Sequence, residues 1–194
     1  LQVGGIDGFI GPEPFNQRAV TTGAGRIFTL TKELWSGHPC CSIAMSKEWR
    51  TAHPEKARRI TAALTQASQM ANDPAQKDQV AEILSREKYL NQKRELFLPT
   101  LAGTYQNWEG EEKTDHERIS FGNPTNPTAI TWMATQLARW NLGGDTLTMD
   151  DPTLIHLADS VLPDDVPRGG DPVTINGRVF DAHTPTAGYE VYTR

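Results

Sequence analysis

Four dipeptides ending in proline mark where helices begin in this 194-residue chain, from residue 53 onward. Proline has no N–H group, so the first position of a helix tolerates it, and a preceding polar side chain can cap the free N–H groups there. Apolar residues at three- and four-residue spacing follow each dipeptide, which predicts amphipathic helices. The dipeptides are His53-Pro54, Asp73-Pro74, Asn126-Pro127 and Asp151-Pro152.

The helix from Pro54 is predicted to reach about Ala71, with one alanine-rich apolar stripe that lets a packing partner approach closely. Ser46 is a plausible cap for a shorter helix ending near Ala52. In the helix from Pro127 we expect the apolar side to carry Ile130, Met133, Ala134, Leu137, Ala138 and Trp140, and Gly143-Gly144 to close it.

The first 45 residues have a different pattern. Residues 6–10, 26–30 and 41–45 are short runs that predict strands, with Phe9 and Ile10 as core candidates. A short helix is expected over 15–20. Strands followed by a long helical run predict an α/β chain with a helix-rich C-terminal half.

Three later segments carry further expectations. In residues 85–103 we expect a helix that is interrupted before Pro99, because proline breaks helix interiors. The charged run in 104–118 predicts a mobile surface loop. Residues 173–180 predict a hairpin, since Asn176-Gly177 suits a type I′ turn.

Bulk composition excludes several classes. The net charge is −5, and the nearest basic cluster, Lys56 to Arg59, shares a helix with Glu55, so we expect no nucleic-acid partner. No run approaches the roughly 20 apolar residues of a membrane span. The chain begins at Leu1 rather than Met, with strand-like sequence close behind, so we expect a fragment that lacks the N-terminal part of its own fold.

The corner between the first strand and the first helix is the leading candidate for a site, because open α/β sheets bind ligands at the carboxyl ends of strands. Its residues include Gly11, Pro12, Glu13, Phe15 and Asn16. The Glu13 carboxylate could contact a ligand or could cap the following helix, and capping is the favoured interpretation.

Cys40 and Cys41 are adjacent and follow His38. A Cys–His nucleophile would need a base and an oxyanion hole, and a metal site would need more ligands than this spacing supplies. The favoured interpretation is a tight loop into a buried strand, with cysteine acting as a small hydrophobe. We find no dinucleotide fingerprint, phosphate loop or metal motif, so we expect no cofactor, no metal and no enzyme activity.

The segment Gly11-Pro12-Glu13-Pro14-Phe15-Asn16-Gln17-Arg18-Ala19-Val20 resembles the Gly-Glu-Pro-Trp-Asn segment of nitrate- and bicarbonate-binding proteins of ABC transporters. The resemblance continues through Leu34-Trp35-Ser36-Gly37-His38-Pro39 and extends over residues 3 to about 142. Further matching segments are Ser46 to Pro54, Asp73-Pro74-Ala75 and Val80 to Ser85.

This resemblance implies part of a two-lobed, type II periplasmic-binding-protein-like fold that closes on a solute and docks on the transmembrane permease subunits of an ABC importer. The location implied is periplasmic or otherwise extracytoplasmic, with or without a membrane tether. Residues 1–45 would end one lobe and supply crossover strands, 46–162 would be the helical part of the other, and 163–194 an extended tail with a hairpin.

Three departures from the family pattern bear on the solute. A glycine whose backbone helps to bind the anion falls on Pro12, which has no N–H to donate. The aromatic position is Phe15 instead of tryptophan, and an anion-contacting lysine falls on Cys41. Because a desolvated anion needs paired charge or dense hydrogen bonding, we expect a small solute other than nitrate.

The ligand-binding residues expected are therefore Gly11, Pro12, Glu13, Phe15, Asn16 and Cys41. The main functional hypothesis is the solute-binding component of an importer. The alternatives are a ligand-sensing regulator on the same fold and an enzyme of the related pyrimidine-precursor type, for which Cys41 is the one candidate reactive residue.

Overall fold

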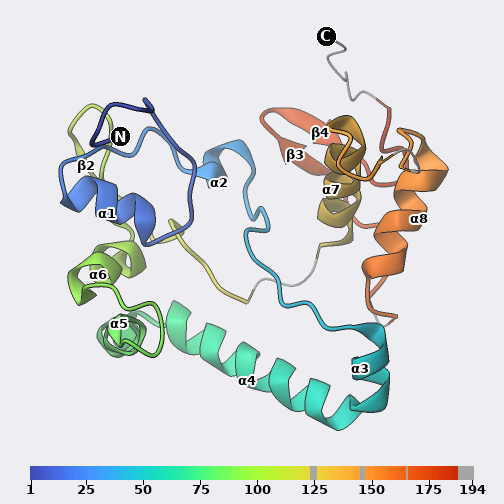
Figure 1. Cartoon of the computed structure of the whole chain (residues 1–194), viewed down its shortest axis with the longest axis horizontal. Helices are drawn as coiled ribbons and strands as arrows, with labels where there is room; N and C mark the ends of the chain where they lie inside the picture. Colours follow the sequence, from blue (N-terminus) through green and yellow to red (C-terminus); the bar gives the residue numbers. More distant parts are fainter. Residues whose placement is uncertain (123–125, 145–146, 165, 188–194) are drawn as a thin grey trace. The chain divides into compact units, whose positions relative to one another are not determined.

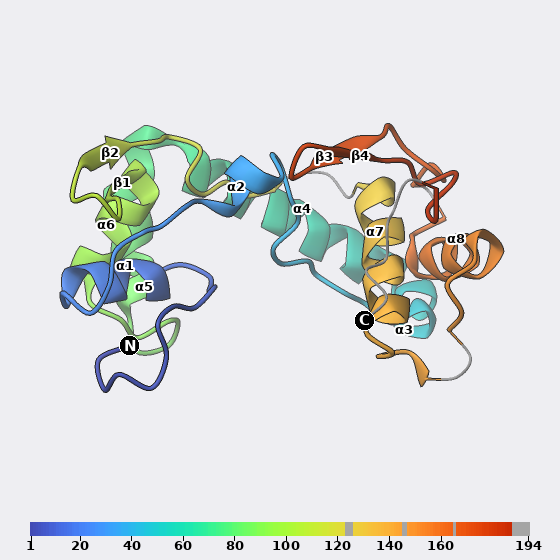
Figure 2. The same cartoon turned by 90° about the horizontal axis from the view of Figure 1, so that it is seen from above.

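The computed structural model describes residues 1–122, 126–144, 147–164 and 166–187. Its contacts divide the chain into two compact units, one made of Leu1–Leu30 and Cys40–Asn123 and the other of Thr31–Pro39 and Pro124–Arg194. Figures 1 and 2 show the elements of each unit. The predicted division at residues 45 and 162 concerns the lobes of a longer protein and stays a prediction.

The first unit contains most of the helices. In chain order its helices are α1 (Phe15–Thr21), α3 (Lys47–Ala52), α4 (Pro54–Asn72), the 3-10 turn η1 (Pro74–Gln76), α5 (Lys77–Ser85) and α6 (Arg94–Ala102). A two-stranded antiparallel sheet follows, with β1 (Thr104–Gln106) paired to β2 (Glu112–Thr114) so that Tyr105 lies opposite Lys113.

The predicted helix starts after Ser46 and at Pro54 are confirmed, whereas Pro74 begins the 3-10 turn η1 and the α-helix α5 follows from Lys77. The Ser46 hydroxyl accepts a hydrogen bond from the Trp49 N–H at 3.1 Å, and Pro54 is the first residue of α4. The Asp73 carboxylate accepts from the Ala75 N–H at 2.9 Å. These starts could be predicted because each depends only on residues within a few positions of the cap.

The core of the first unit lies between α5 and α6. Val80 and Ala81 pack against Phe97 and Leu101, with partly buried hydrophobic residues around them: Met70, Ala71, Leu84, Leu98 and Phe121. Pro99 lies inside α6, so the predicted interruption there is wrong. The burial of the residues on either side of Pro99 outweighs the one backbone hydrogen bond that proline removes.

The three predicted strands in the first 45 residues are wrong for this structure. Residues 6–10 and 41–45 have no regular structure, and residues 26–30 form only a bridge from Ile27 to Asn107. Phe9 and Ile10 are exposed rather than in the core. A strand is held by hydrogen bonds to a neighbour, and among the described residues these segments have no strand beside them.

The segment 104–118 is also not the loop we expected, because it contains the β1–β2 hairpin. Gly103 makes this hairpin possible. It closes α6 at a φ of 81°, and a Cβ there would meet the Asp115 carbonyl oxygen at 2.0 Å. Only glycine accommodates both the left-handed backbone and this close approach.

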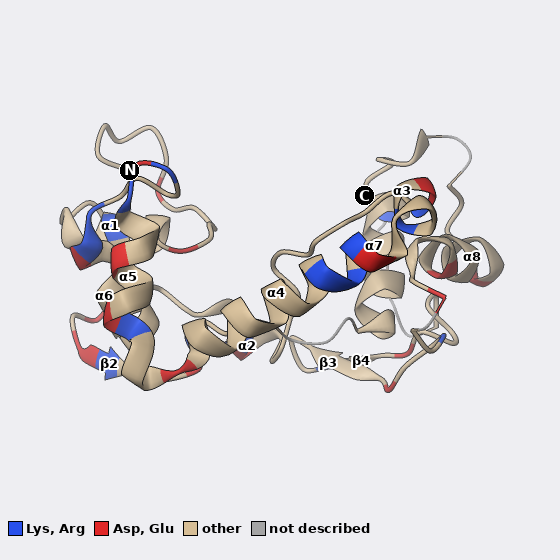
Figure 3. Cartoon of the chain, turned by 90° about the horizontal axis from the view of Figure 1, so that it is seen from below, with Lys and Arg blue, Asp and Glu red and all other residues tan. Residues whose placement is uncertain are grey.

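The apolar stripe of α4 is only partly covered. Met70 and Ala71 pack on the core at its C-terminal end, but Ile60 and Leu64 are exposed. Near its other end α4 carries the basic cluster, which Figure 3 shows interspersed with an acidic residue. Arg58 pairs with Glu55 there, as expected for a solvated face.

The second unit contains α2 (Thr31–Leu34), α7 (Pro127–Arg139), α8 (Asp151–Val161) and the predicted hairpin of β3 (Val173–Ile175) with β4 (Arg178–Phe180). Asn176 and Gly177 both have positive φ, as a type I′ turn requires. The Trp35 ring packs edge-on against that of Trp132 at 5.0 Å between centroids. The Asn176 N–H donates to the Leu34 carbonyl at 2.6 Å, which ties the hairpin turn to α2.

Helix α7 starts at the predicted place but buries a different face. The Asn126 side chain accepts from the Thr128 N–H at 3.0 Å. The buried residues are small or hydroxyl-bearing, namely Thr128, Ala129, Thr131, Ala134 and Thr135. Of the expected apolar side, Ala134 is buried but Leu137 and Trp140 are exposed. The Thr128 and Thr135 hydroxyls donate to backbone carbonyls, which lets these residues be buried. Asn141 adopts positive φ at the end of this helix, where we expected the glycines to close it.

Helix α8 also starts as expected, although its cap is Asp150, one residue before the predicted dipeptide. Asp151 instead accepts hydrogen bonds from the Thr186 N–H and hydroxyl at 2.9 and 2.7 Å. These bonds attach residues near the C-terminus to α8. Residues 188–194, which we expected to be extended, lie outside the described residues.

Truncating the core of the first unit should cost far more stability than truncating the α4 stripe. Phe97 is 3% exposed, so Phe97→Ala should lower the free energy of unfolding by about 3–5 kcal/mol. The matched change Ile60→Ala, at a residue 41% exposed, should cost less than about 1 kcal/mol. Urea unfolding of the two variants measures both values, and equal costs would contradict this packing.

The Asp73 cap should titrate at acid pH. Hydrogen bonds from the Gln76 side chain and the Ala75 N–H lower the pKa of Asp73 below its ordinary 3.8. A lowered folded-state pKa means that the cap stabilises the protein above pH 3.8 and that this stabilisation is lost as the pH falls through the lower value. An NMR titration of the Asp73 carboxyl should give a midpoint below 3.8, and a midpoint above it would disprove the cap.

Candidate functional site

The corner before α1 is held by its own backbone and side chains. The Phe15 N–H donates to the Pro12 carbonyl at 3.1 Å, and the Asn16 side-chain amide donates to the Gly11 carbonyl. One Glu13 carboxylate oxygen accepts from the Gln17 N–H at 3.1 Å. These contacts give the corner a single defined turn into α1.

A buried arginine from far along the chain completes the corner. Arg118 Nη2 and Nε donate to Glu13 Oε1 at 2.6 and 3.2 Å. Arg118 Nη1 donates to the Gln17 side-chain oxygen at 2.9 Å and to the Thr104 carbonyl at 2.6 Å. The guanidinium also lies 5.3 Å from the centre of the Tyr105 ring, a cation–π distance.

The ion pair of Arg118 with Glu13 is buried, which indicates that it holds the fold together. The Arg118 side chain is 0% exposed and that of Glu13 is 12% exposed. The second Glu13 oxygen also accepts from the Thr100 hydroxyl at 3.5 Å, so both oxygens are occupied by protein donors. Glu13 therefore acts as a helix cap and ion-pair partner here, which agrees with the interpretation favoured from the sequence.

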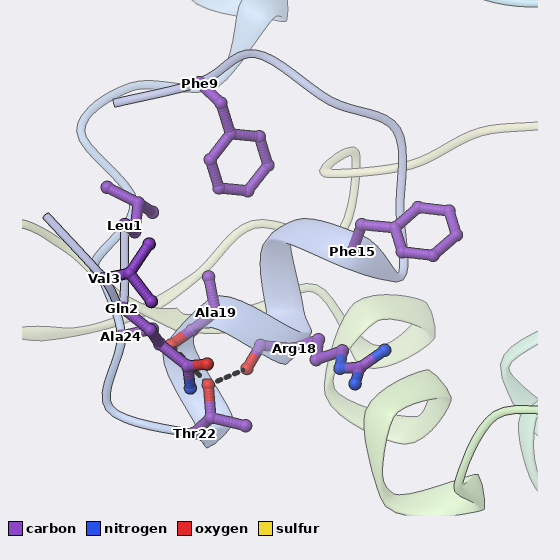
Figure 4. A pocket seen from close by; sticks show the side chains of 9 residues that line it. All are labelled: Leu1, Gln2, Val3, Phe9, Phe15, Arg18, Ala19, Thr22 and Ala24. Carbon is purple, nitrogen blue, oxygen red and sulfur yellow. Dashed lines mark hydrogen bonds between the residues drawn. The ribbon is translucent and has the colours of Figure 1, made fainter. Parts of the chain in front are cut away.

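The solvent side of α1 carries an open hollow of about 430 Å³. Figure 4 shows Leu1, Val3 and Phe9 of the N-terminal loop on one side of it and α1 on the other. Phe15, 47% exposed, and Arg18 come from the first turns of α1 and supply an aromatic face and a cation. Of the six residues expected to bind a ligand, Phe15 is the one that lines this hollow.

The other expected site residues lie around the corner or apart from the hollow. Gly11 and Asn16 are half-buried and bonded to each other, and Pro12 is exposed. Cys41 is exposed in a segment without regular structure. The interpretation of Cys40 and Cys41 as small hydrophobes entering a buried strand is wrong, because no strand forms there to bury them.

Within the described ranges, no group of three or more His, Cys, Asp or Glu side chains could hold a metal ion. No helix in the same ranges is long and apolar enough to cross a membrane.

Comparisons with known proteins give one family-model match and several relatives. Residues 1–85 match the model of the NMT1-like family. The nitrate import ATP-binding protein NrtC of Synechococcus elongatus is 32% identical over 148 residues, which are 73% of this chain and 22% of that protein. The bicarbonate transport ATP-binding protein CmpC of the same organism is 31% identical over 142 residues, or 72% of this chain and 21% of that protein.

A solved structure gives the fold. The crystal structure of the periplasmic nitrate-binding protein NrtA from Synechocystis PCC 6803 superposes with a TM-score of 0.75 and 22% identity, over 90% of this chain and 50% of that one. The family-model match and this likeness support the resemblance of the chain to the nitrate/bicarbonate-type substrate-binding proteins of ABC transporters. The predicted fold class is confirmed as part of an α/β periplasmic-binding-protein fold. The chain spans half of the length of the NrtA structure and about a fifth of the two ATP-binding relatives.

Arg118, Gln17 and Thr100 are the residues of this corner that sequence reasoning missed. Arg118 ends a charged run that we expected on the surface, and its partner Glu13 lies 105 positions away. No local pattern distinguishes an arginine that pairs across such a distance from one that faces solvent. The Glu13-to-Gln17 spacing of one helical turn was the one available signal for the capping bond.

Removing the buried cation of Arg118 should destabilise the protein strongly. Arg118→Met leaves Glu13 buried without its charge partner, and the expected loss is about 3–5 kcal/mol of unfolding free energy. The double variant Glu13→Gln, Arg118→Met should recover part of that loss. Arg94→Met, which breaks the exposed pair with Asp78, is the matched control and should cost less than about 1 kcal/mol. Chemical denaturation compares all three, and similar costs at the two arginines would refute the role given to Arg118.

Proposed function

We propose that this chain is part of the solute-binding component of an ABC importer for a small solute. The observation that carries the proposal is the likeness to a periplasmic nitrate-binding protein over 90% of the chain. In the proposed assembly the complete protein closes on its solute outside the cytoplasm and delivers it to the transmembrane permease subunits. A membrane tether is compatible with this role.

We further propose that the solute is not nitrate. Nitrate is a desolvated anion when bound, so its site needs fixed positive charge or several N–H donors. At the two positions where the family pattern supplies these, this chain has Pro12, which has no N–H, and Cys41, which carries no fixed positive charge. Arg118 does not replace the lost cation, since Glu13 already neutralises it.

A second candidate is a solute-sensing part of a transporter subunit. It is favoured by one observation: NrtC and CmpC are ATP-binding proteins, and this chain resembles only about a fifth of each. This chain contains no G-x-x-x-x-G-K-[ST] loop, the usual nucleotide-binding motif. The segment shared with these proteins would then serve to sense a solute rather than to bind nucleotide.

An enzyme is the weakest of the three classes. It would need a reactive group at the solute site, and Cys41 is the candidate. Thiol labelling of Cys41 combined with an assay for turnover separates this class from the two binding classes. Labelling that changes solute affinity without any turnover would favour binding.

A thermal-shift screen of the full-length protein tests the solute. Stabilisation follows RT ln(1 + [L]/Kd), so a solute at a hundred times its Kd adds about 2.7 kcal/mol and raises the melting temperature. Amides, sulfonates, thiamine precursors and bicarbonate are screened beside nitrate, and we expect a solute other than nitrate to stabilise most. Strong stabilisation by nitrate would contradict the argument from Pro12 and Cys41, and no stabilisation by any solute would count against the binding function.

A further inference from the structure

Cys40 and Cys41 hold their two sulfur atoms close together on the surface. Both residues are exposed, and the Sγ atoms are 3.7 Å apart. In a β-strand, neighbouring side chains point to opposite faces, which would separate these thiols. The irregular backbone at residues 40 and 41 instead brings both sulfurs to one side.

This separation suits two thiolates that share one ion. A disulfide needs its sulfurs at about 2.05 Å, much closer than they lie here. Two sulfurs bonded to one atom at about 2.3 Å each can lie at most about 4.6 Å apart, and the 3.7 Å separation of Cys40 Sγ and Cys41 Sγ lies within that limit. The pair is therefore arranged for chelation with little movement of either side chain.

The ligand set limits which ions fit. Thiolates select soft ions. A closed structural zinc site needs four protein ligands, and in the described ranges no third His, Cys, Asp or Glu joins a metal-holding group. We propose that Cys40 and Cys41 form an exposed two-thiolate site for a soft, thiophilic centre, of the class of Cu(I) or a monosubstituted trivalent arsenical. The site stands on the two thiols alone and does not require the proposed transport function.

The binding step needs no oxidant. With an arsenic(III) oxide R–As=O, each thiol forms one As–S bond, and the two thiol protons leave with the oxide oxygen as water. Arsenic keeps its organic substituent and its oxidation state. The ring that closes contains one atom more than the strained disulfide ring of adjacent cysteines.

Proton release gives the site a pH dependence. Partial burial, the hydrogen bond with Cys41 and the proximity of the Cys41 sulfur raise the pKa of the Cys40 thiol. Because the bound forms are thiolates, binding of Cu(I) releases protons and strengthens as the pH rises.

Phenylarsine oxide tests the site on the reduced full-length protein. We expect one phenylarsenic group per chain by mass spectrometry, loss of both free thiols, and reversal by a small dithiol but not by a monothiol. Cys40→Ser and Cys41→Ser should each bind about a hundredfold more weakly, because the second thiol acts at high effective concentration. The double variant Cys41→Ser, Ser42→Cys keeps two thiols but separates them by one residue, and it should bind more weakly than the natural pair.

A Cu(I) arm with a competing chelator identifies the ion class. If the natural sequence binds Cu(I) more tightly than either serine variant, the site also accepts metal ions. If it binds the arsenical but not Cu(I), the site is specific for trivalent arsenic. Equal binding by the single-cysteine variants and the natural sequence, or reaction at one thiol only, overturns the proposal. The solute screen is scored separately, so the failure of either proposal can be recognised by itself.

Discussion

The buried ion pair of Arg118 with Glu13 connects the parts of the first unit that are most distant in sequence. Through Glu13 it fixes the turn before α1, through Gln17 it holds the first turns of that helix, and through the Thr104 carbonyl it holds β1. Gly103 lets the chain turn tightly enough from α6 into the hairpin for Arg118 to return to α1. A charge removed from water is stable only with such a complete set of partners, so each of these segments depends on the others.

The elements that could be predicted are those whose cause is local. Ser46, Asp73 and Asn126 each accept a hydrogen bond from an N–H group within three residues, and the Asn176-Gly177 turn needs only its own two backbone conformations. The predictions of strands at 6–10 and 41–45 were wrong because a strand is stabilised by hydrogen bonds to a neighbouring strand, and local sequence does not specify that neighbour. The prediction of the buried face of α7 was wrong for a related reason. Threonine is apolar enough to be buried once its hydroxyl has a hydrogen-bond partner.

For the candidate site, the sequence predicted the corner before α1 but not the distant residues that hold this corner in place. The position of Glu13 directly before the first helix favoured a capping role, and in the structure its carboxylate accepts a hydrogen bond from the Gln17 N–H of that helix. The partner in Arg118 could not be found, because pairing across 105 positions leaves no periodic pattern. Whether Gly11, Pro12, Phe15, Asn16 and Cys41 contact a solute stays a prediction. Phe15 is the one of them that also borders the hollow beside α1.

In the alignment that the resemblance implies, the family's lysine falls on Cys41, and the proposed two-thiolate site would rest on a different kind of recognition. A lysine ammonium attracts an anion over several ångströms, and its long stem tolerates small changes of backbone. Two thiols can share an ion only while their sulfurs stay within a narrow range of distances, which the backbone at residues 40 and 41 sets. If residues 41–45 became a strand that extended back to Cys40, the side chains would point to opposite faces and the pair would be lost. The proposed dithiol chemistry and strand formation at this segment are therefore mutually exclusive, so any partner that pairs with this segment would also control its affinity for soft ions.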